Sequence, residues 1–337
     1  MYYHISTNAQ FMKKRNNSID TVAGIMILYM IFMHCCQFTN MMDCKFMQFM
    51  QIVFVGFMAW FFFKSGMYHH QEQNAKHILE KTCPKLLRPY IVFSIIGWPI
   101  YCISLLSRND TTWWHYLLTP CKNVLLSGSY GGALPLWFLI TLLLVKVISP
   151  IILNKFKHKG WIICGFIGWF LYWINENYLT IYPIYIMNFF PAMFFYGFGY
   201  FLKERQFNKC ILFVSIIIFM VSFIYPSILD FRTNKISDGL YPLYILYSMS
   251  SIVVFNNVFK NINRSITHIF TLIGKQSMYW YCAHWPILII INLLTKTYFP
   301  FLESIQLLLI SFTLVITILC LIRPLVYNTN LKYIIGL

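Results

Sequence analysis

The chain has 337 residues, of which 59% are apolar and 11% charged, whereas soluble globular proteins contain about 45–50% apolar and about 25% charged residues. A water-soluble fold of this composition would expose too much apolar surface, so the composition indicates a membrane protein. The formal charge of +16 would suit a nucleic-acid partner, but the basic residues fall in short loops between apolar segments, as membrane orientation requires. We therefore expect the protein to interact with a lipid bilayer and not with nucleic acid.

Ten apolar segments follow one another with short polar breaks, and they are long enough to cross a bilayer as helices of about 20 residues. The predicted spans are 19–39, 48–68, 86–106, 135–153, 161–176, 186–203, 210–229, 239–259, 277–295 and 303–323. The sequence thus predicts an all-α, polytopic membrane protein whose helices form one bundle. We expect an N-terminal tail over 1–18, a membrane domain over 19–325 and a C-terminal tail over 326–337.

The distribution of Lys and Arg predicts the orientation of this bundle. With an even number of spans both termini lie on one side, and that side carries 19 of the 26 basic residues, whereas the other carries six and Lys146 lies within a span. Basic residues are retained on the cytoplasmic side, so both tails are expected in the cytoplasm. The first apolar stretch has no small-residue cleavage signature and is expected to stay in the cytoplasmic (inner) membrane as the first of many passes.

The ten cysteines show no paired spacing typical of zinc or redox sites, so no metal is expected. Most of them fall inside apolar segments and should be buried, inert thiols. Cys44 and Cys121 both lie in loops on the predicted outer side, where an optional disulfide between them could form.

The first span contains two ionisable residues, Asp20 at its start and His34 near its end. Such groups are costly inside a membrane, so each is a candidate for function, and a structural His bonded to a neighbouring helix is the alternative. At 14 residues apart, they share roughly one helix face but lie about 21 Å from each other, too far for a hydrogen bond. One face therefore presents a carboxylate at the cytoplasmic mouth and an imidazole toward the outer leaflet.

The most basic cytoplasmic loop follows the second span, which ends with Lys64, Ser65 and Gly66. Lys85 and Arg88 come at the start of the third span, three residues apart, and on one helix face they could together bind phosphate. Anchoring of the helix at the cytoplasmic surface by positive charge explains the same two residues equally well.

A second group of candidates lies in the ninth and fourth spans. Ser277 and His284 are seven residues apart and share a helix face, which places His284 about 10 Å inside the cytoplasmic end. A lone His in such a helix more often packs or hydrogen-bonds than reacts. Lys146 either extends its ammonium toward the surface or faces a polar cavity.

Together these segments resemble the acyltransferase-3 family, integral membrane O-acyltransferases that modify extracytoplasmic sugars and related acceptors. The similarity extends over nearly the whole chain and includes the number of spans. It is carried in order by Asp20, Gly24 and His34; by 62–66 (FFKSG) followed by 85–90 (KLLRPY); by 135–139 (PLWFL); by 197–203 (GFGYFLK); and by 273–277 (IGKQS) through Tyr281 to His284. One position departs from the family, since Ala23 stands where a basic residue usually precedes Gly24.

The resemblance implies transfer of an acyl group, most often acetyl, from cytoplasmic acetyl-CoA or another acyl-CoA to a hydroxyl of a glycan or lipid-linked sugar acceptor. His34 would be the general base, since His is the side chain that ordinarily titrates near neutral pH, with Asp20 on the same helix. Lys85 and Arg88 would hold the coenzyme phosphates, with Lys64 and Ser65 nearby. The chain would work beside polysaccharide-biosynthesis machinery and without a metal.

Two other classes of protein fit the same features. A secondary transporter or glycan flippase also needs a polar path, basic mouths and ionisable groups inside the membrane. A structural subunit of a polysaccharide-export complex, including an inactive relative of the enzymes, is the other. Consumption of a thioester separates the enzyme from both.

Overall fold

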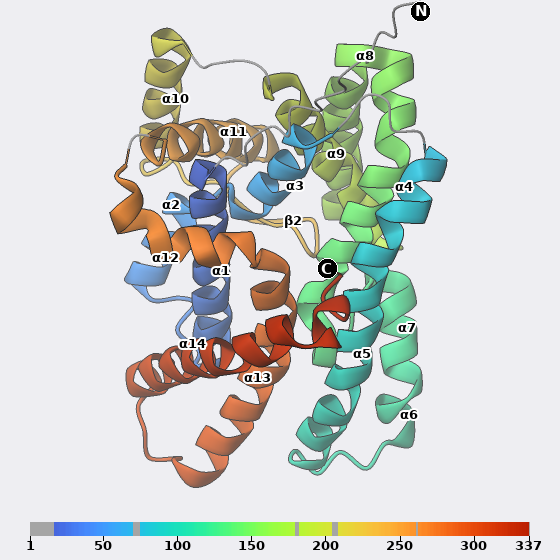
Figure 1. Cartoon of the computed structure of the whole chain (residues 1–337), viewed down its shortest axis with the longest axis vertical. Coiled ribbons are helices and arrows are strands. Elements are labelled where there is room, and N and C mark those ends of the chain that lie inside the picture. Colours follow the sequence, from blue (N-terminus) through green and yellow to red (C-terminus); the bar gives the residue numbers. More distant parts are fainter. Residues whose placement is uncertain (1–16, 70–74, 179–181, 204–207, 261, 337) are drawn as a thin grey trace, which may run out of the picture.

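The computed structural model describes residues 17–69, 75–178, 182–203, 208–260 and 262–336, which form helices and one short β-hairpin (Figure 1). Within these ranges, seven helical segments are long and apolar enough to cross a bilayer. They are Asn17–Phe38, Lys45–Met67, Cys83–Leu106, Leu118–Lys157, Ile184–Leu202, Ser277–Tyr298 and Ser304–Asn328. The chain is therefore a predominantly helical, multi-pass membrane protein, as its composition predicts.

The elements follow one another with short connections. In the first half of the chain they are α1 (Asn17–Phe38), α2 (Lys45–Val53), α3 (Phe57–Met67), α4 (Ala75–Lys81), α5 (Cys83–Leu106), α6 (Trp113–Tyr116), α7 (Leu118–Ser127) and the 3-10 turn η1 (Gly131–Leu136). The second half contains α8 (Trp137–Asn177), α9 (Ile184–Leu202), α10 (Lys209–Val221), β1 (Ile228–Asp230), β2 (Lys235–Asp238), α11 (Tyr241–Val258), α12 (Arg264–Lys275), α13 (Ser277–Tyr298), α14 (Ser304–Asn328) and η2 (Asn330–Tyr333).

Three of the ten predicted spans form helices that do not meet the same length and hydropathy criterion. The span at 161–176 is the second arm of α8, which breaks at Lys157 with backbone angles of 48° and −130°. The span at 210–229 corresponds to α10, which has only 13 residues and ends at Val221. The span at 239–259 forms α11, whose serines and asparagines lower its hydropathy. A total of ten crossings stays a prediction.

The prediction of an all-α chain is wrong at one place, because a β-hairpin replaces the end of the seventh predicted span. β1 and β2 pair antiparallel, with Asp230 opposite Lys235. Pro226 cannot donate a backbone hydrogen bond, and the following Asp, Asn and Gly residues favour turns over helix. Asn234 takes a left-handed conformation with φ of 51° at the turn, which Asn tolerates better than most residues.

Pairs of glycines let helices approach each other closely. A Cβ built on Gly24 of α1 would overlap the carbonyl oxygen of Phe270 in α12, and a Cβ on Gly274 of α12 would overlap that of Asp20 in α1. The same reciprocal arrangement holds for Gly66 with Gly199 between α3 and α9, and for Gly97 with Gly132 between α5 and η1. Several glycines of the family-like segments are therefore required by backbone packing.

The C-terminal segment packs against the membrane bundle. α14 continues to Asn328, and Ile335 is buried. A Cβ built on Gly336 would overlap the carbonyl oxygen of Lys85, which places the end of the described chain against the first turn of α5 (Figure 1).

The optional disulfide between Cys44 and Cys121 is not formed. Both side chains are free thiols, and the Cys44 Sγ accepts a hydrogen bond from the Met47 backbone N–H at 3.4 Å, at the N-terminus of α2.

Candidate active site

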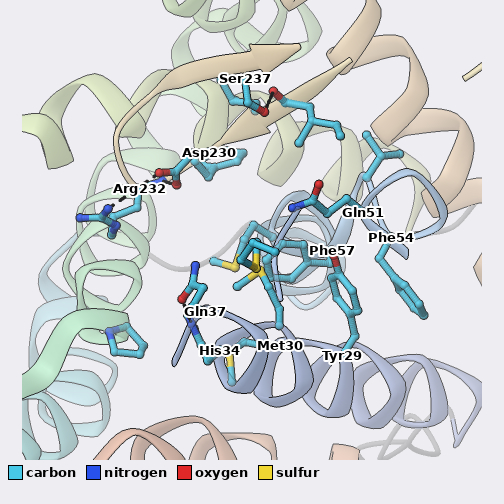
Figure 2. Close-up of a pocket in the computed structure, with 18 of the residues that line it drawn as sticks. Tyr29, Met30, His34, Gln37, Gln51, Phe54, Phe57, Asp230, Arg232 and Ser237 are labelled. Carbon is cyan, nitrogen blue, oxygen red and sulfur yellow. Dashed lines mark hydrogen bonds and ion pairs between the residues drawn. The ribbon is translucent and has the colours of Figure 1, made fainter. Parts of the chain in front are cut away.

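A cavity of about 310 Å³ lies between α1, the start of α8, α13 and the β-hairpin (Figure 2). Most of its wall is apolar or aromatic, which is typical of sites that orient a ligand with few polar groups. The polar and charged side chains in the wall are His34, Gln37, Gln51, Asp230, Arg232 and Ser237, together with the hydroxyls of Tyr29, Tyr244 and Tyr281.

His34 is held in one orientation by its own helix. Its Nδ1 lies 2.7 Å from the Oε1 of Gln37, one turn further along α1. Because an amide oxygen only accepts hydrogen bonds, Nδ1 carries the proton in this arrangement and donates it to Gln37. The Nε2 of His34 is then the ring nitrogen that can take a proton from a ligand.

His284 of α13 lies directly behind His34. The two rings are stacked at 17° with centroids 5.4 Å apart, and Trp285 meets the His34 ring edge-on at 5.0 Å. The Nδ1–H of His284 donates to the carbonyl oxygen of Tyr281 at 2.7 Å. His284 is fully buried, and among the described residues its Nε2 has no hydrogen-bond partner. The structure thus brings two separately predicted residues, His34 and His284, into one cluster.

Ser277 lines a second, smaller cavity of about 50 Å³. Met30, Met58 and Tyr281 belong to the walls of both cavities, so the small cavity is a neighbour of the large one. Ser277 precedes His284 by seven residues, about two helical turns, so it lies in the wall of the small cavity and not beside the imidazoles.

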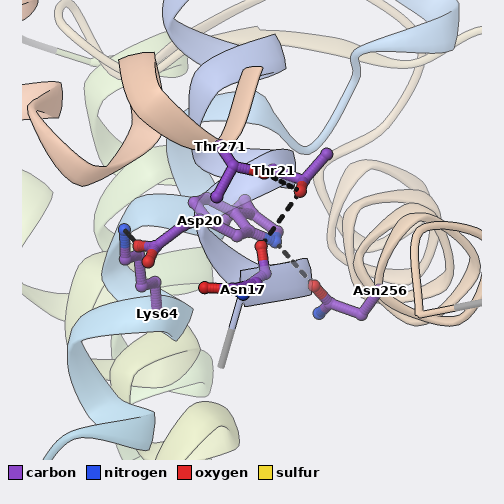
Figure 3. A network of polar contacts seen from close by, with 7 residues as sticks. Asn17, Asp20, Thr21, Lys64, Asn256 and Thr271 are labelled. Carbon is purple, nitrogen blue, oxygen red and sulfur yellow. Dashed lines mark hydrogen bonds and ion pairs between the residues drawn. The ribbon is translucent and has the colours of Figure 1, made fainter. Parts of the chain in front are cut away.

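Asp20 forms an ion pair away from the cavity (Figure 3). The carboxylate is fully buried, and its Oδ1 lies 3.5 Å from the Nζ of Lys64 on α3. Ala23 follows Asp20 by three residues, so both lie on one face of α1. Lys64 therefore brings a cation from a neighbouring helix to the face where the family usually carries one on the first helix.

Further polar contacts join helices around the start of α1. The hydroxyls of Thr21 and Thr271 lie 2.8 Å apart across the contact between α1 and α12. The indole N–H of Trp60 on α3 donates to the Oδ1 of Asn256 on α11 at 3.2 Å. This cluster surrounds the start of α1, at the opposite end of the helix from His34.

The remaining predicted site residues lie outside the wall of the large cavity. Lys85 and Arg88 are exposed on one face of α5, as their spacing predicts. Ser65 on α3 and Lys146 on α8 are half-buried. None of these four described residues contributes to the two cavities that contain His34 and Ser277.

Sequence reasoning missed Gln37 and the charged tip of the hairpin. Gln37 follows His34 by three residues, a spacing at which two side chains on a helix meet. This spacing could have identified Gln37 as a partner of His34. Asp230 and Arg232 carried no such signal, because the segment before them was interpreted as a membrane span.

In a comparison with protein families, residues 16–323 match the family model of acyltransferase-3, which is described as an acyltransferase domain. The match includes His34 and His284 and confirms the resemblance carried by the sequence motifs. Comparison with curated proteins and with solved structures found no significant match.

Proposed function

The chain belongs to the acyltransferase-3 family, and we propose from this that it is a membrane O-acyltransferase, acting most simply as an O-acetyltransferase. In this proposal it moves an acyl group from cytoplasmic acyl-CoA to a hydroxyl of a cell-envelope or exported polysaccharide, presented as a glycan or a lipid-linked sugar. The single observation that carries the proposal is the orientation of His34, whose Nδ1 bonds to Gln37 in the wall of a cavity.

The geometry of His34 supports a role as general base. Its Nε2 takes the proton of the acceptor hydroxyl as that oxygen attacks the thioester carbonyl carbon. The tetrahedral intermediate then collapses, the carbon–sulfur bond breaks, and the proton on His34 passes to the departing thiolate. Gln37 keeps the imidazole in the required tautomer throughout, because its carbonyl oxygen holds the Nδ1 proton.

The donor would approach His34 from the side of the small cavity at Ser277, which shares the wall residues Met30, Met58 and Tyr281 with the large cavity. In this proposal the pantetheine arm of coenzyme A lies along this side of α13. Lys85 and Arg88 would bind the coenzyme phosphates at the cytoplasmic surface, since their exposed cations share one face of α5.

The experiment that tests the function follows the acyl group itself. The purified full-length protein in lipid nanodiscs is given acetyl-CoA labelled in the acetyl group and cell-envelope glycans from the same cells. We expect label to enter the glycans as an alkali-labile ester, with release of one thiol for each ester formed. If the protein moves glycans across vesicle membranes without releasing thiol, it is a flippase or transporter and the proposal is wrong. If it does neither, the alternative of an inactive export subunit replaces the enzyme.

A further inference from the structure

The side of the cavity across from α1 is formed by a β-hairpin whose tip carries two opposite charges. Figure 2 shows the hairpin above His34 and Gln37, with Asp230 and Arg232 beside each other at its tip, and both residues belong to the cavity wall. Gln51 and Ser237 add an amide and a hydroxyl to this wall. The wall that contains His34 therefore also contains a carboxylate and a guanidinium.

The tip of the hairpin is shaped by bonds from Asp230. Its Oδ1 accepts the backbone N–H of Arg232 at 3.0 Å, and its Oδ2 accepts the hydroxyl of Thr233 at 2.8 Å. Phe231 between them is buried and anchors the tip in the core. Its ring is surrounded by the rings of Phe62, Trp137, Phe195 and Tyr244, with centroids 5.5–6.4 Å away.

Two buried asparagines fix the tip to the long helices. Asn188 of α9 donates from Nδ2 to the carbonyl oxygen of Arg232 at 3.2 Å. Asn175 of α8 donates in the same way to the carbonyl oxygen of Asn234 at 3.3 Å. The backbone on both sides of the Arg232 side chain is thus held in place, and a guanidinium held this way is preorganised for a ligand.

The guanidinium of Arg232 has unused hydrogen-bonding capacity. Its nearest acidic partner among the described residues is Asp230, with Nη2 and Oδ2 3.9 Å apart, beyond the about 2.7–3.2 Å of an N–H···O hydrogen bond. The side chain is 39% exposed and lines the cavity. Both carboxylate oxygens of Asp230 accept hydrogen bonds within the turn. The N–H groups of the Arg232 guanidinium are therefore available to bind a planar anion.

We propose that Arg232 binds an anionic group of the acceptor, a carboxylate or a phosphate on the sugar, while the reacting hydroxyl lies at His34. This inference rests on the proposed function, because it names the acceptor class for that same cavity. Arg232 selects the acceptor and positions it, and it takes no part in the transfer of the acyl group.

The test compares sugars that differ only in the group at C6, which is neutral in one and anionic in the other two. Binding of p-nitrophenyl β-glucuronide, p-nitrophenyl β-glucoside and the 6-phosphate of that glucoside is measured on the full-length protein in nanodiscs, without acyl-CoA. We expect at least one of the anionic sugars to bind about 10- to 100-fold more tightly than the glucoside, as a charge-assisted bond would give. The two anionic arms distinguish carboxylate from phosphate.

Two variants distinguish binding at Arg232 from a nonspecific effect of positive charge on the hairpin. Arg232→Gln should abolish the preference for the anionic sugar over the glucoside. Lys235→Gln is the matched control, because Lys235 lies on the same hairpin but is exposed and outside the cavity wall; it should keep the preference. Equal binding of all three sugars by the wild type, or an undiminished preference in Arg232→Gln, overturns the inference. If the wild-type protein prefers an anionic sugar but transfers no acyl group in the assay with labelled acetyl-CoA, the proposed function is wrong and the binding site for the anionic sugar stands.

Discussion

Asp20 and Lys64 form an ion pair in which each charge offsets the cost of burying the other. The carboxylate is fully buried and the Lys64 side chain is 17% exposed, with the two charged atoms 3.5 Å apart. A buried charge without its partner is strongly unfavourable, whereas a matched pair replaced by apolar or neutral groups is often tolerated. Lys64 of α3 thus places a cation beside Asp20, on the helix that has Ala23 where the family usually has a basic residue.

A double-mutant cycle tests this pair. Lys64→Met alone should lower the stability of the purified protein by about 1–3 kcal/mol, because it leaves the Asp20 carboxylate without its cation. Adding Asp20→Asn should restore part of that loss. Thermal unfolding in detergent with an intrinsic fluorescence readout measures all four proteins. Effects that add within about 0.5 kcal/mol would mean that the two residues are energetically independent.

At the scale of elements, the crossing of α1 and α12 depends on the absence of two side chains. Gly24 and Gly274 each face the backbone of the other helix, so a methyl group at either position forces the helices apart. The movement would shift α1, which carries His34 and Gln37.

We expect Gly24→Ala to destabilise the protein by about 1–3 kcal/mol, the usual cost of overpacking a tight contact. Ile269→Ala is the control, because Ile269 lies on the exposed face of the same α12 helix and its truncation should leave the crossing intact. The comparison of melting temperatures in one detergent measures both. A Gly24→Ala protein as stable as the control would show that the helices do not meet at this crossing.

The start of α5 is the element that should bind the coenzyme. Lys85 and Arg88 lie on its exposed face, and replacing both by Gln should weaken binding of labelled acyl-CoA about tenfold or more through loss of charge-assisted phosphate contacts. Replacing Lys155 and Lys159 by Gln removes the same charge from an exposed part of α8 and should have little effect. If the two double variants bind acyl-CoA equally well, Lys85 and Arg88 only anchor the helix at the membrane surface.

At the scale of the whole molecule, the excess of basic residues on one side predicts that both termini are cytoplasmic. A reporter inserted at Asp110 should then lie outside, and one fused after Leu337 should lie in the cytoplasm. Compartment-specific reporters, such as a phosphatase active only outside and a fluorescent protein active only inside, measure both positions. If both insertions report the same compartment, the topology of ten crossings is wrong.

The sequence predicted the membrane spans, because each depends on the composition of one continuous segment. A membrane span needs an uninterrupted apolar stretch, so the segments containing α1, α5 and α14 were found close to their true bounds. The hairpin was missed because apolar strands and apolar helices have similar composition over a few residues. The residues of the site were partly found, since His34 in the cavity wall and His284 behind it each stood out as ionisable groups in apolar helices.

What the sequence could not give was the pairing of residues distant along the chain. His34 and His284 are 250 residues apart, and only the packing of α1 against α13 brings their rings together. The partner of Asp20 likewise comes from another helix, so its spacing to His34 on α1 gave no information about Lys64. Arg232 enters the cavity only because the hairpin folds back over it.

The most direct test of the account is the rate of acyl transfer by a His34→Gln protein. Gln keeps much of the volume and a hydrogen-bonding group but takes no proton near neutral pH, so a general base at this position predicts a loss of about 10²–10⁴-fold in transfer from labelled acetyl-CoA. His34→Ala should show a comparable loss, and both proteins should insert and unfold like the wild type. A His34→Gln protein that transfers acetyl at a near-normal rate would contradict the account and leave His284 as the candidate base.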